Sequence, residues 1–266
     1  VKRDLAIPGP AGTIPARLYD TRADREAGPV MVFYHGGGFV IGNLDTHEPY
    51  CAEAARQLDM PVISIDYRLA PEAPFPAAPE DCEAATRWIA DNIPCTGLIL
   101  SGDSAGGNLA AALCLKARDD GGPKLRGQVL IYPGLGGDVD AGSYVTHAKA
   151  PMLTRDDVLF YAGIRHNGAV PKGDATVSPL QDTDFSGLPP TIAFGAECDP
   201  LCDDARKYAE AIVTAGGRAH WVVEPGLVHG YLRARKTVDR AAASFARITQ
   251  ALQTLATGGN PKGDAR

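Results

Sequence analysis

The sequence of 266 residues lacks long apolar runs and clusters of positive charge. Its longest uninterrupted apolar stretch, Leu109 to Leu115, is too short to cross a hydrocarbon core of about 30 Å. The formal net charge is −6 and no block of lysine and arginine occurs, which leaves no electrostatic footprint for nucleic acid or an anionic membrane. We therefore expect a soluble protein that binds neither nucleic acid nor a membrane.

Cysteine is sparse, and its spacing predicts no disulfide framework. Of the six cysteines, Cys51, Cys82 and Cys114 fall in segments of helical period, where a small buried apolar side chain is the simpler explanation. The first residues lack the apolar core of a secretory signal peptide, so the sequence gives no support for secretion. Both observations favour a reducing compartment, and we expect a cytoplasmic protein.

Apolar, β-rich runs alternate with longer stretches of helical period, which is typical of parallel strands joined by crossover helices. Runs such as Val30 to Tyr34 show no polar alternation, so helices should cover both faces of the sheet. The fold class is therefore α/β, with a mostly parallel central sheet. Strands are predicted at residues 14–19, 30–34, 62–67, 98–101, 128–132, 191–196 and 219–223, and helices at 46–58, 79–92, 105–118, 201–215 and 236–255.

One region, residues 134–187, interrupts this alternation. It contains no clear strand, only a helix that Thr154 would open, with Asp157 as its capping-box partner. A long excursion between two core strands commonly lies over the carboxyl ends of the strands, where ligands bind. We therefore expect a single domain over residues 1–266, with residues 134–187 as a small helical cap or lid insertion.

The most informative motif is the segment Gly102-Asp-Ser104-Ala-Gly106, which lies between a predicted strand and a predicted helix. A serine in G-x-S-x-G at such a junction sits on a cramped turn that lifts its hydroxyl above the sheet. The alternative is a glycine-rich turn with a helix-capping serine. In this context the pattern predicts that Ser104 is a nucleophile.

A second motif, His35 to Phe39, places three consecutive glycines directly after a strand. Glycines let main-chain N–H groups approach a small ligand closely, as an oxyanion hole requires. The predicted donors are the amides of Gly37, Gly38 and Ala105. A dinucleotide site is the competing interpretation, but its third glycine would have to stand where Ile41 stands.

A serine hydroxyl needs a base, and the base needs a carboxylate that fixes its tautomer. Among the six histidines, His229 alone follows a predicted core strand through a turn. Asp199 also follows a strand and gives the chain order Ser, Asp, His, although a helix N-cap would explain it too. Cys198 and Cys202 near it offer no paired-ligand spacing for zinc, so neither a metal nor a cofactor is implied.

These motifs together resemble those of the bacterial hormone-sensitive-lipase-like carboxylesterases, a family with the α/β-hydrolase fold. The segments that carry the resemblance are 35–39, 66–72, 75–78, 102–108, 131–133, 199–201 and 229–230. The resemblance implies a Ser104, Asp199 and His229 triad, with Gly37, Gly38 and Ala105 in the oxyanion-hole positions. Some relatives pair two copies through the final strand and helix, which implies a homodimer.

The sequence departs from this family before Val30. Relatives usually carry N-terminal helices that form half of the cap, whereas the 29 residues here indicate a strand ribbon. Only the insertion can then cover Ser104, which predicts a shallow pocket and short acyl chains. The candidate substrate-binding residues are Phe39, Met152, Leu153, Phe160 and Tyr161.

The predicted function is that of a serine carboxylesterase acting on a small-molecule ester of short acyl chain through an acyl-enzyme. An amidase, formamidase or thioesterase with the same triad remains an alternative, because the motifs do not fix the leaving group. A non-catalytic small-molecule receptor on the same fold is a third reading. All three triad positions are filled, which favours the enzyme.

Overall fold

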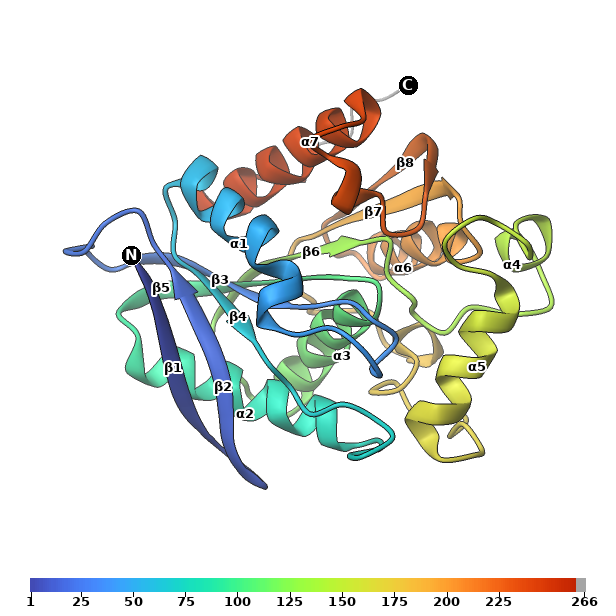
Figure 1. Ribbon diagram of the computed structural model, residues 1–266, viewed down its shortest axis with the longest axis horizontal. Coiled ribbons are helices and arrows are strands. Elements are labelled where there is room, and N and C mark those ends of the chain that lie inside the picture. Colours follow the sequence, from blue (N-terminus) through green and yellow to red (C-terminus); the bar gives the residue numbers. More distant parts are fainter. Residues whose placement is uncertain (262–266) are drawn as a thin grey trace.

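The computed structural model describes residues 1–261 as a central sheet of eight strands with helices on both faces (Figure 1). The strands follow the order β1-β2-β4-β3-β5-β6-β7-β8 across the sheet. Their bounds are β1 (Lys2–Gly9), β2 (Gly12–Tyr19), β3 (Gly28–Tyr34), β4 (Val62–Ile65), β5 (Cys95–Asp103), β6 (Leu125–Ile131), β7 (Thr191–Cys198) and β8 (Ala219–Val228).

Strands β3 to β8 pair in parallel, whereas β1 pairs antiparallel with β2 and β2 antiparallel with β4. The predicted mostly parallel α/β sheet is thus confirmed, and the N-terminal ribbon consists of β1 and β2. The strand predicted at 62–67 ends at Ile65, because the chain then turns toward the next helix, where Asp81 binds both the backbone and the guanidinium of Arg68.

Two hydrophobic clusters fix the helices on the two faces of the sheet. One cluster joins the sheet to α2, α3 and α6, and the other joins it to α1 and α7. Figure 1 shows α1 and α7 above the sheet and α2 and α3 below it. The five long helices are α1 (Leu44–Leu58), α2 (Ala77–Asn92), α3 (Ala105–Asp119), α6 (Cys202–Thr214) and α7 (Asp239–Ala256), with η2 (Tyr231–Ala234) before the last.

In the segment between β6 and β7, residues 132–190, the helices α4 and α5 lie beside the layered body, whereas η1 packs against α3 and α6 (Figure 1). It contains α4 (Ser143–Thr146), α5 (Arg155–His166) and η1 (Pro179–Gln181). Thr154 caps α5 as predicted: its hydroxyl accepts from the Asp157 amide, while the Asp157 carboxylate accepts from the Thr154 amide. The two short helices α4 and η1 were not predicted.

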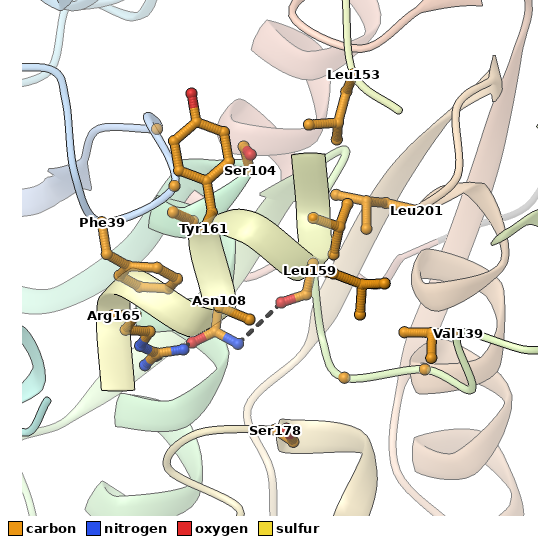
Figure 2. Close-up of a pocket in the computed structure, with 18 of the residues that line it drawn as sticks. Phe39, Ser104, Asn108, Val139, Leu153, Leu159, Tyr161, Arg165, Ser178 and Leu201 are labelled. Carbon is orange, nitrogen blue, oxygen red and sulfur yellow. Dashed lines mark hydrogen bonds between the residues drawn. The ribbon is translucent and has the colours of Figure 1, made fainter. Parts of the chain in front are cut away.

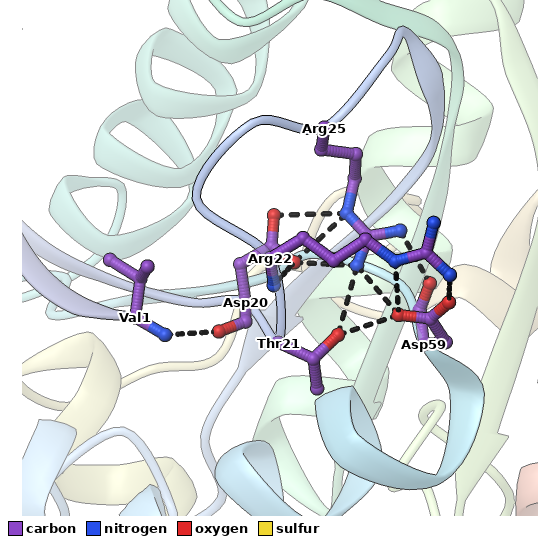
Figure 3. A network of polar contacts seen from close by, with 6 residues as sticks. All are labelled: Val1, Asp20, Thr21, Arg22, Arg25 and Asp59. Atoms are coloured by element: carbon purple, nitrogen blue, oxygen red, sulfur yellow. Dashed lines mark hydrogen bonds and ion pairs between the residues drawn. The ribbon is translucent and has the colours of Figure 1, made fainter.

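A polar network joins the β2–β3 loop to the end of α1 (Figure 3). Arg25 donates to Asp20 and, at 2.9 Å, to Asp59, which also accepts from the Thr21 hydroxyl at 2.6 Å. These donors hold the pKa of Asp59 below its usual value. Because β4 begins just after this end of α1, the network lies at the amino ends of the parallel strands.

Among residues 1–261, no helix combines the length and apolarity needed to cross a membrane.

Candidate active site

The carboxyl ends of four parallel strands meet at one edge of the sheet and position the predicted site residues. Tyr34, the last residue of β3, pairs with Gly102 of β5, so the glycine motif and Ser104 emerge side by side. Asp199 follows the end of β7, and His229 follows the end of β8. The four segments predicted to carry chemistry therefore meet at this edge.

Ser104 occupies a strained turn between β5 and α3, with φ 55° and ψ −117°. Close packing explains the glycines on either side of it. A Cβ on Gly102 would lie 2.3 Å from the Gly106 backbone, and one on Gly106 would lie 1.8 Å from the Tyr34 carbonyl oxygen. Only glycine fits at both places, and the turn that results holds the Ser104 hydroxyl at the sheet edge.

His229 links Ser104 to a buried carboxylate. Its Nε2 lies 2.8 Å from the Ser104 Oγ, and its Nδ1 lies 2.6 Å from Oδ2 of Asp199, which is fully buried. The other Asp199 oxygen accepts from the Leu201 amide at 3.0 Å. Because a carboxylate only accepts, the Nδ1 of His229 carries the ring proton and Nε2 is left to accept the serine proton. The ring edge also packs on Tyr132, with centroids 4.8 Å apart.

The glycine motif forms a tight loop beside this hydroxyl. Gly37 has φ +132° and Gly38 φ +61°, and the Gly37 carbonyl accepts from the amides of Val40 and Ile41. A Cβ on Gly38 would lie 2.6 Å from the Tyr161 ring, so α5 packs directly on the loop. Gly37, Gly38 and Ala105 line the same cavity as Ser104. The oxyanion hole expected of these three residues stays a prediction, with all three placed around the cavity that holds the Ser104 hydroxyl.

A buried carboxylate behind Ser104 joins the glycine loop to the serine turn, and sequence reasoning missed it. Asp103 accepts from the Gly36 amide at 2.8 Å, lies 3.2 Å from Nε2 of His47 and accepts from the Tyr132 hydroxyl at 3.3 Å. Burial alone would raise the pKa of Asp103, but His47 and the Gly36 amide lower it to about 2. Its position inside G-D-S-A-G was the only sequence signal.

The cavity above Ser104 has a volume of about 710 Å³, within the range of small-molecule sites. Residues of α5 and of the loops that flank it form part of the cavity wall, and the shallow pocket expected from the sequence stays a prediction. Four of the candidate substrate-binding residues, Phe39, Met152, Leu153 and Tyr161, line it. Figure 2 shows Phe39, Leu153 and Tyr161 around the cavity.

Phe160 does not line the cavity, and its inclusion among the wall residues was wrong. Phe160 is 64% exposed, and its ring lies edge-to-face with the Tyr161 ring, with centroids 5.9 Å apart. Consecutive residues of an α-helix point about 100° apart. When Tyr161 faces the cavity, Phe160 must therefore turn outward.

A second residue that sequence reasoning missed is Arg165. It lies four residues after Tyr161, on the same face of α5, and lines the cavity although its side chain is almost fully buried. Helical spacing from Tyr161 is the signal that could have found it.

Comparisons with known proteins agree with this geometry. A sequence model of the α/β-hydrolase fold matches residues 31–233. This chain belongs to the α/β-hydrolase family. Within it, the resemblance to the hormone-sensitive-lipase-like carboxylesterases is confirmed by relatives named as esterases and by solved esterase structures.

Two relatives and one solved structure show how similar this α/β-hydrolase is to named esterases. Esterase LipI of Mycobacterium tuberculosis is 40% identical over 268 residues, covering 96% of this chain and 82% of the relative. The ethyl acetate hydrolase of Pseudomonas putida is 32% identical, covering 91% of this chain and 78% of its own. The structure of EstE1, a thermostable carboxylesterase from a metagenomic library, superposes with a TM-score of 0.91 at 34% identity, covering 96% and 89% of the two chains.

Proposed function

We propose that this α/β-hydrolase cleaves short-chain carboxylic esters through an acyl-enzyme formed on Ser104. In the first step His229 accepts the Ser104 proton at Nε2 while Oγ attacks the ester carbonyl. Asp199 stabilises the imidazolium that forms. His229 then protonates the departing alcohol, which leaves the acyl group on Ser104.

Water completes the cycle in the second step. His229 removes a proton from water, which attacks the acyl-enzyme, and the acid leaves as Ser104 recovers its proton. In both steps a negative charge develops on the carbonyl oxygen. The amides of Gly37, Gly38 and Ala105 would donate to it, and each such donor is commonly worth about 3 to 4 kcal/mol in the transition state.

The single observation that carries this proposal is the chain of two short hydrogen bonds from Ser104 through His229 to Asp199, at 2.8 and 2.6 Å. The protein is a carboxylic ester hydrolase, like the relatives that are named as esterases. The amidase, thioesterase and receptor alternatives are not favoured. The relative named for ethyl acetate supports a preference for short esters.

We further propose that the chain is one domain in which residues 134–187 act as the cap. Their contribution to the cavity wall through Met152, Leu153 and Tyr161 supports this role. Free thiols at all six cysteines support a cytoplasmic location.

We also propose that two copies pair through the last strand of the sheet. The sheet ends at β8, where Val223 is 40% exposed, and this free edge supports the pairing. Light scattering of the purified protein tests that dimer.

A p-nitrophenyl ester series from acetate to laurate tests the proposed activity. We expect the highest kcat/KM at acetate to butyrate. A preference for laurate would contradict the short-chain proposal. Matched p-nitroanilide and thioester substrates should be cleaved far more slowly, and faster cleavage of either would replace the ester assignment.

A further inference from the structure

Arg165 is a buried cation that forms no ion pair in the described part of the chain. The residue is 5% exposed, and no carboxylate oxygen of the described residues lies within 4 Å of its nitrogens, although the charge of Asp174 acts on it from further away. One terminal nitrogen donates to the Val177 carbonyl at 3.3 Å and the other to Asn108 Oδ1 at 3.5 Å. The Nε has no hydrogen-bond partner among residues 1–261.

The environment of this guanidinium is costly for a charge. The central carbon of the guanidinium lies 3.6 Å from the centroid of the Phe39 ring and 5.5 Å from that of the Phe75 ring. Its two hydrogen bonds go to neutral groups and are long, at 3.3 and 3.5 Å. Burial lowers the pKa of Arg165 to about 9, so it stays protonated at neutral pH. Buried charges in proteins are normally paired, because an unpaired one loses its hydration without compensation. Asp174 compensates this charge only from beyond 4 Å, and the Nε still lacks an acceptor within residues 1–261, so the guanidinium keeps donor capacity for an anion.

An anion bound by Arg165 would have room in the cavity that also holds Ser104. Figure 2 shows Arg165 beside Asn108 and under the Phe39 ring, with Ser104 beyond Tyr161. Asn108 is one helical turn after Ser104 on α3, about 6 Å along the axis. A ligand that reached both the hydroxyl and the guanidinium would need only a short chain between its two ends.

The other charges around the cavity favour an anion as well. Lys172 and Arg233 line it and are exposed, whereas Asp138 is its one exposed lining carboxylate. The second lining carboxylate, Asp103, is already occupied by His47 and two hydrogen-bond donors. The cavity thus carries an excess of positive charge in a chain whose net charge is −6.

We propose that Arg165 binds a carboxylate of the substrate, so that the preferred substrates are short esters that bear a free carboxylate at the end away from the reacting carbonyl. This inference rests on the proposed ester hydrolysis at Ser104 and names its substrate class. A planar guanidinium with unused donors suits a carboxylate, which it can hold through two parallel hydrogen bonds.

The test compares charged and neutral esters of equal length on the unmodified protein. Ethyl hydrogen glutarate is paired with ethyl pentanoate, in which a methyl group replaces the carboxylate. A second pair, γ-acetoxybutyrate with butyl acetate, moves the charge to the alcohol side. We expect kcat/KM at least tenfold higher for the charged member of one pair. Equal or lower values in both pairs would overturn the proposal and leave the esterase function intact.

Two arginine variants locate the effect. Arg165→Met removes the charge and should lower the charged-to-neutral ratio of kcat/KM at least tenfold. Arg155→Met, on the same helix but outside the cavity wall, should leave that ratio unchanged. A ratio that survives Arg165→Met would refute the assignment, as would an equal fall in Arg155→Met.

A binding measurement keeps the proposal testable apart from turnover. Glutarate should bind the unmodified protein in calorimetry and inhibit hydrolysis of p-nitrophenyl acetate competitively, with the neutral glutaramide at least tenfold weaker. No difference between the diacid and the diamide would contradict the proposal even if Arg165→Met failed to fold. Hydrolysis of none of the esters, with glutarate still bound, would instead contradict the proposed function alone.

Discussion

Replacing Asp199 by asparagine tests how the buried carboxylate controls His229. One oxygen of Asp199 accepts from the Leu201 amide and the other faces Nδ1 of His229. In Asp199→Asn the side-chain oxygen must stay on the Leu201 amide, because the opposite orientation would set two N–H groups against each other. The new NH₂ group then faces His229.

That orientation forces the wrong tautomer on the imidazole. Nδ1 must accept from the asparagine, so the ring proton moves to Nε2, where it points at the Ser104 hydroxyl and blocks proton removal. We expect kcat to fall by about 10⁴, the size of this tautomer effect in serine triads. At 1.36 kcal/mol per tenfold change in rate, this corresponds to about 5 kcal/mol of activation free energy.

The assay is kcat on p-nitrophenyl butyrate at neutral pH, with thermal unfolding of the variant as a check on folding. Asp203→Asn is the matched control, since Asp203 binds Ser143 and Arg206 rather than His229. It should change kcat less than threefold. A loss below tenfold in a folded Asp199→Asn protein would refute the tautomer argument and move the acid to another residue.

Two further predictions concern buried carboxylates near the site. His47→Phe leaves Asp103 buried without its basic partner and should cost about 3 kcal/mol more in free energy of unfolding than His47→Gln, which can still donate; urea unfolding measures both, and equal losses would contradict the pairing. Burial raises the pKa of the Asp204 carboxyl in the folded protein to about 6, whereas its pKa in the unfolded chain is about 4. The stability that this raised pKa contributes is fully present below about pH 4 and is lost as the pH rises through 6. The unfolding free energy of the parent should therefore fall relative to Asp204→Asn by about 1 kcal/mol between about pH 5 and pH 8, and a constant difference would contradict the raised pKa.

The parts of the site that could be predicted from sequence are those that follow from local structure. Ser104 is fixed by glycines two residues to either side, and Asp199 and His229 each follow a strand whose apolar run is visible. Parallel strands then bring all three to one edge. The fold class followed for the same reason, from alternating strand and helix periods.

The parts that were missed depend on contacts between distant segments. Asp103 meets the Gly36 amide across 67 residues, and Arg165 meets Asn108 across 57. The G-D-S-A-G motif marks Asp103 and helical spacing from Tyr161 marks Arg165, but neither pattern indicates the distant partner that the residue contacts. Phe160 was wrongly assigned to the cavity because neighbouring aromatic residues look equivalent in sequence, whereas the helix turns one of them to solvent.

The central claim is that Ser104 is the nucleophile, and covalent labelling tests it most directly. Diethyl p-nitrophenyl phosphate should transfer one diethylphosphoryl group per chain to the Oγ of Ser104 and release p-nitrophenol, with activity lost in proportion. Mass spectrometry of the digested protein locates the group. Ser104→Ala should fold normally, take up no label and lose nearly all turnover. A label on another residue that accounts for the inactivation, or substantial turnover by Ser104→Ala, would contradict the account.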